Sequence, residues 1–146
     1  GHTYMGHPVA CAAALAVQTT IRDEQLLSNV QAMSATLFEK LRKQFGNHPN
    51  VGDIRGRGLF IGLELVADRA SKQPLAPESM IHTRIKQAAM AQGLICYPMS
   101  GTIDGRQGHH ILLAPPFIIN DNHADELVAK LALSVDDALL HQYKAA

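Results

Sequence analysis

The sequence predicts an α+β fold, in which a small, mostly antiparallel sheet of three or four strands carries helices on one face and follows a long connecting helix. Several segments repeat apolar residues every three or four positions, as amphipathic helices do. Shorter segments are almost continuously apolar and end at glycine or proline, as buried strands do. With 47% hydrophobic residues in 146 positions, the chain can bury one modest core.

The first predicted helix runs from Pro8 to about Arg22. Proline suits the first helical position because its fixed φ matches the helix and its missing N–H would be unpaired there in any case. The segment 10–16 is rich in alanine, which favours helix and adds little side-chain bulk. This helix can therefore approach a neighbouring element closely.

The second predicted helix starts near Leu26 and ends at Gly46, ahead of Pro49. Its apolar residues recur at intervals of three and four, which places them on one buried stripe. The members of this stripe are Leu26, Val30, Met33, Leu37, Leu41 and Phe45.

Two predicted strands, 51–54 and 59–66, flank the turn Gly56-Arg57-Gly58. The second strand is nearly continuous in apolar residues, which indicates cover on both faces. Glu64 interrupts it, and because a carboxylate without a partner is costly there, we expect a salt bridge. We expect structural roles for Arg55 and Arg57.

The remaining elements follow in the order helix, strand, strand, helix. The third helix starts at Pro77 and stops at Gly93, and the strands cover 94–97 and 111–114, on either side of a glycine-rich loop. Asn120 or Asp121 caps the last helix. Its buried stripe consists of Leu127, Leu131, Val135, Ala138 and Leu139.

Composition excludes several classes of function. The 13 basic and 13 acidic residues give a formal net charge of zero, which leaves no electrostatic footprint for nucleic acid or for an anionic membrane surface. No apolar run approaches the roughly 20 residues that a membrane span needs. Cys11 and Cys96 are interpreted as buried thiols in a reducing compartment, which predicts a cytoplasmic protein. The histidines lack ligand-like spacing, so no metal site is expected.

The stretch from Gly1 to Pro8 gathers two glycines, two histidines and a threonine in front of a helix. The backbone amides of a turn and of a following helix N-terminus attract anions, and the Thr3 hydroxyl adds a donor. The residues alone allow two interpretations: a phosphate-binding turn, or an ordinary helix start with Thr3 as a local cap.

Three motifs then resemble one family. The stretch HTYMGHPVACAAAL at 2–15 resembles the signature of class III (ω-type) pyridoxal-phosphate aminotransferases. The stretch VGDIRGRGLFIGLEL at 51–65 resembles the first segment of that family's small C-terminal domain. GLIC at 93–96 and LAPPFII at 113–119 resemble its closing strands. The motifs occur in the family's order and cover nearly the whole chain.

The resemblance implies the C-terminal portion of a fold-type I enzyme whose cofactor is pyridoxal 5'-phosphate. Residues 1–24 would be the end of a large-domain loop and the interdomain helix, and residues 25–146 the small C-terminal domain. In the family, the threonine that matches Thr3 binds the cofactor phosphate across the interface of a homodimer. The Schiff-base lysine and the carboxylate that faces the pyridine nitrogen lie upstream of it. We therefore expect no catalytic residue in this chain, which alone would be inactive.

The resemblance also implies a reaction, the transfer of an amino group from an amine, ω-amino acid or amino acid to a keto acid. Many relatives bind the substrate carboxylate through an arginine two residues before the alanine of Ala-Pro-Pro, where this sequence has Leu112. Some ω-transaminases use a mobile arginine in this region, which makes Arg106 the candidate substrate-binding residue. Alternatively, Arg106 pairs with Asp104 or extends into solvent.

Two other classes of function stay open. One is a non-catalytic α+β module that binds a ligand or regulates a partner. The other is a fold-type I enzyme with different chemistry, such as an aminomutase or a decarboxylase. For the favoured interpretation, the expected partners are the upstream large domain, a second subunit, and a small amine and keto acid, with neither nucleic acid nor membrane.

Overall fold

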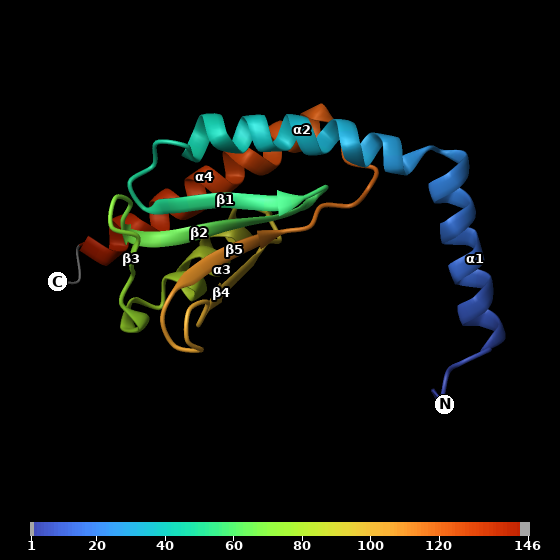
Figure 1. Cartoon of the computed structure of the whole chain (residues 1–146), viewed down its shortest axis with the longest axis horizontal. Helices are drawn as coiled ribbons and strands as arrows, with labels where there is room; N and C mark the ends of the chain where they lie inside the picture. Colours follow the sequence, from blue (N-terminus) through green and yellow to red (C-terminus); the bar gives the residue numbers. More distant parts are fainter. Residues whose placement is uncertain (1, 144–146) are drawn as a thin grey trace.

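The computed structural model describes residues 2–143, and the side chains of residues 2–140. One antiparallel sheet lies beneath helices that cover one of its faces, and a separate helix extends from the N-terminal side (Figure 1). The α+β prediction is therefore confirmed. Within residues 2–143, none of the helices combines the length and the hydropathy that a membrane crossing needs.

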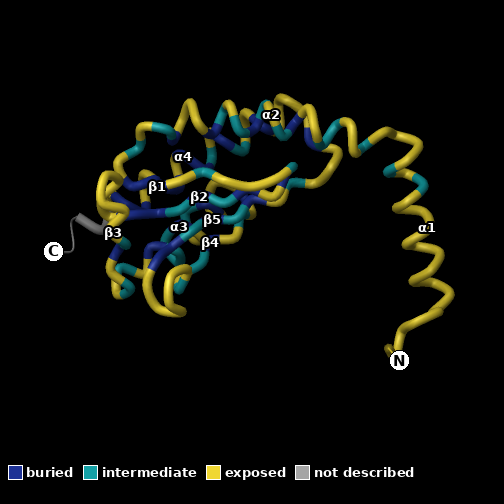
Figure 2. The backbone as a smooth tube through the Cα atoms, in the orientation of Figure 1, coloured by how far each residue is buried: buried dark blue, intermediate teal, exposed yellow. Residues whose placement is uncertain are grey.

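The separate helix is α1 (Pro8–Asp23), which matches the first predicted helix and has Pro8 in its first turn. None of its residues is buried, and it stands apart from the sheet at one end of the molecule (Figure 2). Cys11 on this helix is exposed and Cys96 is half-buried, so the interpretation of both as buried thiols is wrong for this chain.

Three helices cover the sheet. α2 (Leu26–Phe45) contacts β1, α3 (Ile81–Ala91) contacts β4 and β5, and α4 (Asp121–Tyr143) packs against both helices. Their apolar stripes point toward the sheet, as the spacing predicts. The buried members of the two longer stripes are Met33, Leu37, Leu41 and Phe45 in α2, and Leu131, Val135, Ala138 and Leu139 in α4.

The sheet has the strand order β1 (Val51–Arg57), β2 (Phe60–Asp68), β5 (His109–Leu113), β4 (Tyr97–Ser100), and every pairing is antiparallel. A fifth strand, β3 (Gln73–Pro74), pairs with the end of β2. It was missed because its two residues lie in a polar stretch that contains a proline and has the composition of a loop.

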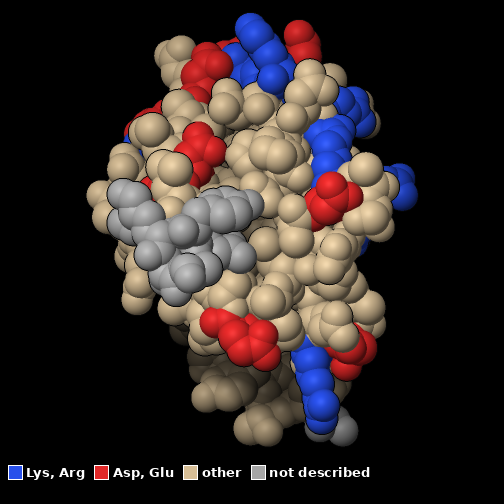
Figure 3. All heavy atoms as spheres, turned by 90° about the vertical axis from the view of Figure 1, so that its left-hand side faces the viewer, with Lys and Arg blue, Asp and Glu red and all other residues tan. Residues whose placement is uncertain are grey.

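The two faces of the sheet differ in cover. Residues of β2 and β5 alternate between them, and the helix-facing residues are almost fully buried: Ile61, Leu63, Leu65, Ile111 and Leu113. On the other face, Phe60 is exposed while Glu64, His110 and Leu112 are half-buried. We call this surface the open face. At the end of the molecule shown in Figure 3, acidic and basic side chains are interspersed.

The observed starts of β4 and α3 differ from the predicted ones, and each difference has a structural reason. The strand predicted over 94–97 begins at Tyr97, because Gly93 has φ +73 and the Leu94 N–H donates to the Ala89 carbonyl at 2.8 Å. Leu94 therefore closes the end of α3 as its apolar capping residue. The helix predicted from Pro77 is a short 3-10 turn, η1 (Pro77–Ser79), and α3 starts only after a left-handed residue at position 80.

Candidate functional site

The turn that carries Thr3 lies at the start of α1, far from the sheet (Figure 1). Backbone hydrogen bonds close this turn, since the Met5 N–H donates to the His2 carbonyl at 3.1 Å. The next such bond joins the His7 N–H to the Tyr4 carbonyl, also at 3.1 Å. Thr3 is exposed, so its hydroxyl is accessible from outside the chain.

The first turn of α1 adds backbone donors beyond this hydroxyl. His7, the residue before the helix, is extended and makes no side-chain cap hydrogen bond. Because the first N–H groups of a helix have no intrahelical partner and lie at its positive end, the amides of Val9 and Ala10 are suited to an anion. Gly6, at φ +75, supplies the left-handed turn that leads into them.

The loop between β4 and β5 is braced by its own backbone. The Gly101 N–H donates to the Gly108 carbonyl at 2.9 Å. The Asp104 carboxylate accepts hydrogen bonds from the N–H groups of Gln107, at 2.6 Å, and Arg106, at 2.9 Å. These bonds lower the pKa of Asp104. Asp104 thus holds the Arg106 backbone, while the Arg106 side chain is exposed.

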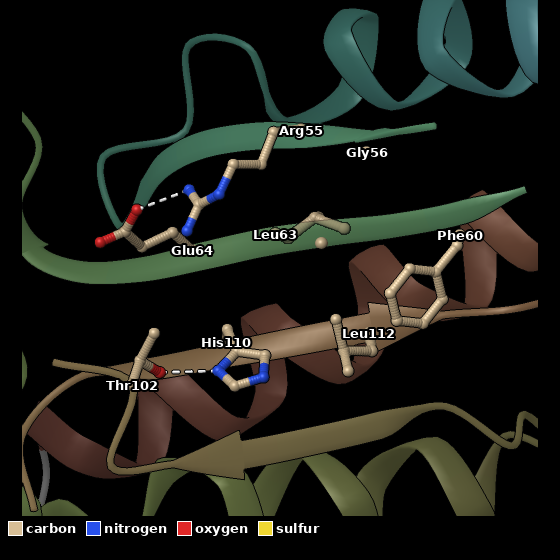
Figure 4. Close-up of a pocket in the computed structure, with 9 residues that line it drawn as sticks. Arg55, Gly56, Phe60, Leu63, Glu64, Thr102, His110 and Leu112 are labelled. Atoms are coloured by element: carbon tan, nitrogen blue, oxygen red, sulfur yellow. Dashed lines mark hydrogen bonds and ion pairs between the residues drawn. The ribbon is translucent and has the colours of Figure 1, made fainter. Parts of the chain in front are cut away.

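A cavity of about 260 Å³ occupies the open face (Figure 4). Gly62 of β2 lines this cavity and lies directly between Arg55 on β1 and Leu112 on β5 in the strand register. Because glycine has no side chain, the sheet is hollowed at this point. Phe60 and Leu112 supply apolar walls, and Thr102 reaches the cavity from the β4–β5 loop.

Arg55 is paired with two carboxylates at the polar end of this cavity. Its Nη1 donates to Asp53 Oδ2 at 2.7 Å and to Glu64 Oε2 at 2.9 Å. Glu64, and then Asp53, raise the pKa of Arg55, and the Arg55 hydrogen bond lowers the pKa of Asp53. The predicted salt bridge of Glu64 is therefore confirmed.

His110 of β5 lies directly across the sheet from Glu64. Its Nδ1 is 2.6 Å from the Oγ1 of Thr102. Burial, and then the charge of Arg55, lower the pKa of His110, while Glu64 acts in the opposite direction. Burial and Arg55 thus favour the neutral form of the His110 ring. Sequence reasoning did not find this contact, because the register that joins the loop to β5 is set by tertiary pairing.

The adjacent histidine, His109, points to the opposite face and is fully buried. Since successive strand residues alternate between faces, the pair 109–110 does not converge on one ion. Among the residues that the structure describes, no group of three or more His, Cys, Asp and Glu side chains has an arrangement that could hold a metal. The N-terminal end of α1, which follows the turn with Thr3, lies well apart from the strands β4 and β5 that flank the loop with Arg106 (Figure 1).

The comparisons with known proteins fit this arrangement. The family model described as Aminotransferase class-III matches residues 1–135. The chain belongs to the class III aminotransferase family. An uncharacterized aminotransferase of Schizosaccharomyces pombe is 48% identical over 133 residues, which are 91% of this chain and 29% of that protein. An ethanolamine-phosphate phospho-lyase homolog of Caenorhabditis elegans is 35% identical, over 89% of this chain and 26% of that protein.

A solved aminotransferase structure shows the same fold. The pyridoxamine-phosphate-bound form of a Vibrio fluvialis aminotransferase superposes with a TM-score of 0.80 at 34% identity, over 92% of this chain and 28% of that one. Pyridoxal phosphate is the cofactor of this family. The chain spans about 30% of the length of the relatives it matches.

Proposed function

We propose that this chain is the C-terminal part of a pyridoxal-phosphate-dependent aminotransferase, which moves an amino group from an amine, ω-amino acid or amino acid to a keto acid. The match of the family model over residues 1–135 carries this proposal. The short span of the chain relative to its relatives supports the view that an upstream large domain completes the enzyme. On this view the lysine that holds the cofactor lies in that domain.

The exposure of α1 supports the proposed division of the chain. Residues 1–24 would form the end of a large-domain loop and the interdomain helix, and residues 25–146 the small domain. A helix of 16 residues with no buried side chain is near the limit of stability in water. The large domain and a second subunit would supply the contacts that α1 lacks here.

Thr3 is proposed to bind the cofactor phosphate in the other subunit of a homodimer. The residues fit a phosphate, because the exposed hydroxyl and the uncapped first-turn amides of α1 offer donors and no acidic residue lies in that turn. The bound cofactor would supply the electron sink for amino transfer. The α1 end of the chain lies apart from β4 and β5, which is consistent with Thr3 and the β4–β5 loop contributing to two different active sites of a dimer.

Arg106 is proposed to bind the substrate carboxylate. Its guanidinium is exposed, and among the described residues its only hydrogen bond runs through the backbone N–H. Because Asp104 holds that backbone in place, the side chain alone would move toward or away from a carboxylate. This motion would let one site accept a keto acid and an uncharged amine in turn.

The decisive experiment compares the 146-residue chain with a longer product of the same gene. The longer protein should take up pyridoxal phosphate, absorb visible light and transfer an amino group to a keto acid. The 146-residue chain supplied with the cofactor should do none of these three things. Transamination by the short chain, or a longer protein that binds the cofactor without transamination, would overturn the proposal.

One observation favours a second candidate. A relative at 35% identity is named a phospho-lyase homolog, so related chains occur in proteins with names other than aminotransferase. Release of ammonia and a carbonyl product from an amine without a keto-acid acceptor would identify a lyase. Release of carbon dioxide from an amino acid would identify a decarboxylase, and interconversion of amine isomers an aminomutase. A non-catalytic module would bind ligand without turnover in either protein length.

A further inference from the structure

We propose that the cavity over Gly62 binds an apolar substituent of a small molecule, a ring or a branched aliphatic group, and that it does not bind a carboxylate. The inference rests on the proposed aminotransferase function only for the identity of the molecule that carries this substituent. The shape, the walls and the charges of the pocket carry the inference (Figure 4).

The shape follows from the strand register. Gly62 has Arg55 as its neighbour on one side and Leu112 on the other. A Cβ at Gly62 would be 3.6 Å from the nearest Leu112 methyl and 3.8 Å from the Arg55 carbonyl, which is ordinary contact. Packing therefore does not require glycine here, and its consequence is the hollow itself. A cavity of about 150 Å³ with apolar walls can hold a benzene ring, so 260 Å³ is sufficient for a substituted ring.

Two apolar side chains form part of the walls. Phe60 and Leu112 come from adjacent strands and both line the cavity. Phe60 remains 60% exposed. Covering an aromatic side chain of this size is favourable, because it removes apolar surface from water. A ring inserted over Gly62 would cover both side chains without displacing any hydrogen bond of the sheet.

The charges disfavour an anion. Among the residues that the structure describes, Arg55 is the one Lys or Arg that lines the cavity, and it already pairs with Asp53 and Glu64 through a single nitrogen. One positive and two negative charges leave the polar end with a net negative charge. Burial and the charge of Arg55 lower the pKa of His110, which disfavours a second positive charge beside Arg55. A carboxylate that entered would therefore meet like charge, which raises the cost of its desolvation.

The first test is an NMR titration of the ¹⁵N-labelled chain with benzyl alcohol and, separately, with glutarate. We expect the Gly62 and Leu112 amides to shift saturably with benzyl alcohol and to show no saturable shift with glutarate. Gly62→Val fills the hollow and should raise the dissociation constant of benzyl alcohol, measured at the Leu112 amide, at least tenfold. The control Ile95→Val alters a separate apolar groove and should leave these shifts unchanged.

The second test releases the arginine. In the double variant Asp53→Asn, Glu64→Gln, Arg55 loses both anionic partners, so glutarate should now produce a saturable shift at Gly62, with an affinity at least tenfold above that of the unaltered chain. A gain of binding cannot arise from unfolding. Saturable glutarate binding to the unaltered chain, absence of a benzyl alcohol response, or an unaffected Gly62→Val variant would each overturn the inference.

These readouts separate the two proposals. If benzyl alcohol binds as expected but the longer gene product does not transaminate, the pocket stands and the proposed function fails. If the longer product transaminates but no probe shifts Gly62, the pocket inference fails alone. In the active enzyme, Gly62→Val should lower kcat/KM for an aryl amine at least tenfold more than for a short unbranched amine.

Discussion

His82 and His109 stack inside the domain, with ring centroids 5.5 Å apart and planes inclined by 29°. His109 is fully buried, and neither of its ring nitrogens has a hydrogen-bond partner among the described residues. This contact joins α3 to β5, so it couples the packing of the helix to the protonation of the ring.

The unpaired histidine predicts that the domain loses stability in acid. Burial, then His82 and His110, lower the pKa of His109 below its ordinary value of 6.5. The unfolded chain therefore binds more protons than the folded chain as the pH falls. The free energy of unfolding is highest above pH 6.5 and decreases below that value. Chemical unfolding between pH 7.5 and pH 5 should show this decrease. His109→Leu should reduce it, whereas the exposed His123→Gln should not.

Loss of the Thr3 hydroxyl should weaken retention of the cofactor in the intact enzyme. Thr3→Ala would leave a charged phosphate short of one donor, which costs roughly 1–3 kcal/mol. The measurement is the dissociation constant of pyridoxal phosphate from the apo-enzyme. Thr3→Ser keeps the hydroxyl and should retain most of the affinity. An unchanged affinity in Thr3→Ala would exclude the phosphate role.

Arg106→Ala should act on one substrate only. If the guanidinium binds the carboxylate of the keto acid, KM for that acceptor should rise far more than KM for a hydrophobic amine. Steady-state kinetics with each substrate varied in turn measure this difference. Arg57→Ala is a suitable control, because it removes another exposed arginine for which no substrate contact is proposed. Equal effects on both substrates would contradict the assignment.

Asn29 should stabilise the segment that follows β5. Its Nδ2 donates to the Phe117 carbonyl at 2.7 Å and to the Ile119 carbonyl at 2.9 Å. Asn29→Ala removes both bonds and should lower the free energy of unfolding by about 1–3 kcal/mol. Urea unfolding measures the change. Gln31→Ala, at an exposed position on the same helix, should shift it by less than about 0.5 kcal/mol.

Two glycines of the β1–β2 hairpin should respond oppositely to alanine. A Cβ at Gly56 would lie 2.2 Å from the Phe60 carbonyl oxygen, so Gly56→Ala must displace backbone and should cost about 1–3 kcal/mol. Gly62 has ordinary contact distances, and Gly62→Ala should gain about 0.5–1 kcal/mol because glycine weakens a strand. Equal effects in urea unfolding would contradict the described register.

Elements that bury a periodic stripe could be predicted from the sequence, because burial itself creates the period. The stripe of α2 from Met33 to Phe45 is an example. Leu94 shows the limit of this reasoning. It is apolar because it caps α3, and a short apolar segment that caps a helix has the same composition as a short strand.

Some features of the candidate sites could also be predicted from the sequence, and others could not. The salt bridge of Glu64 could be predicted, because a carboxylate within an apolar strand demands a partner. Its partner is Arg55, which lies beside it only through the cross-strand register of β1 and β2. The hollow over Gly62 has no signal in the sequence, since it depends on which residues flank a glycine in space. The roles of Thr3 and Arg106 stay predictions.

Because α1 is exposed, its backbone hydrogen bonds should open far more readily than those of the helices that cover the sheet. The buried segments of the helices that cover the sheet are expected to exchange only when the domain unfolds cooperatively, whereas α1 depends almost entirely on its own helical propensity. Hydrogen exchange should therefore be fast from Val9 to Arg22 and slow from Met33 to Phe45. Any protein surface that covers α1 would slow exchange from Val9 to Arg22 alone. The exchange rate of this segment therefore measures whether α1 is bound to another domain or subunit.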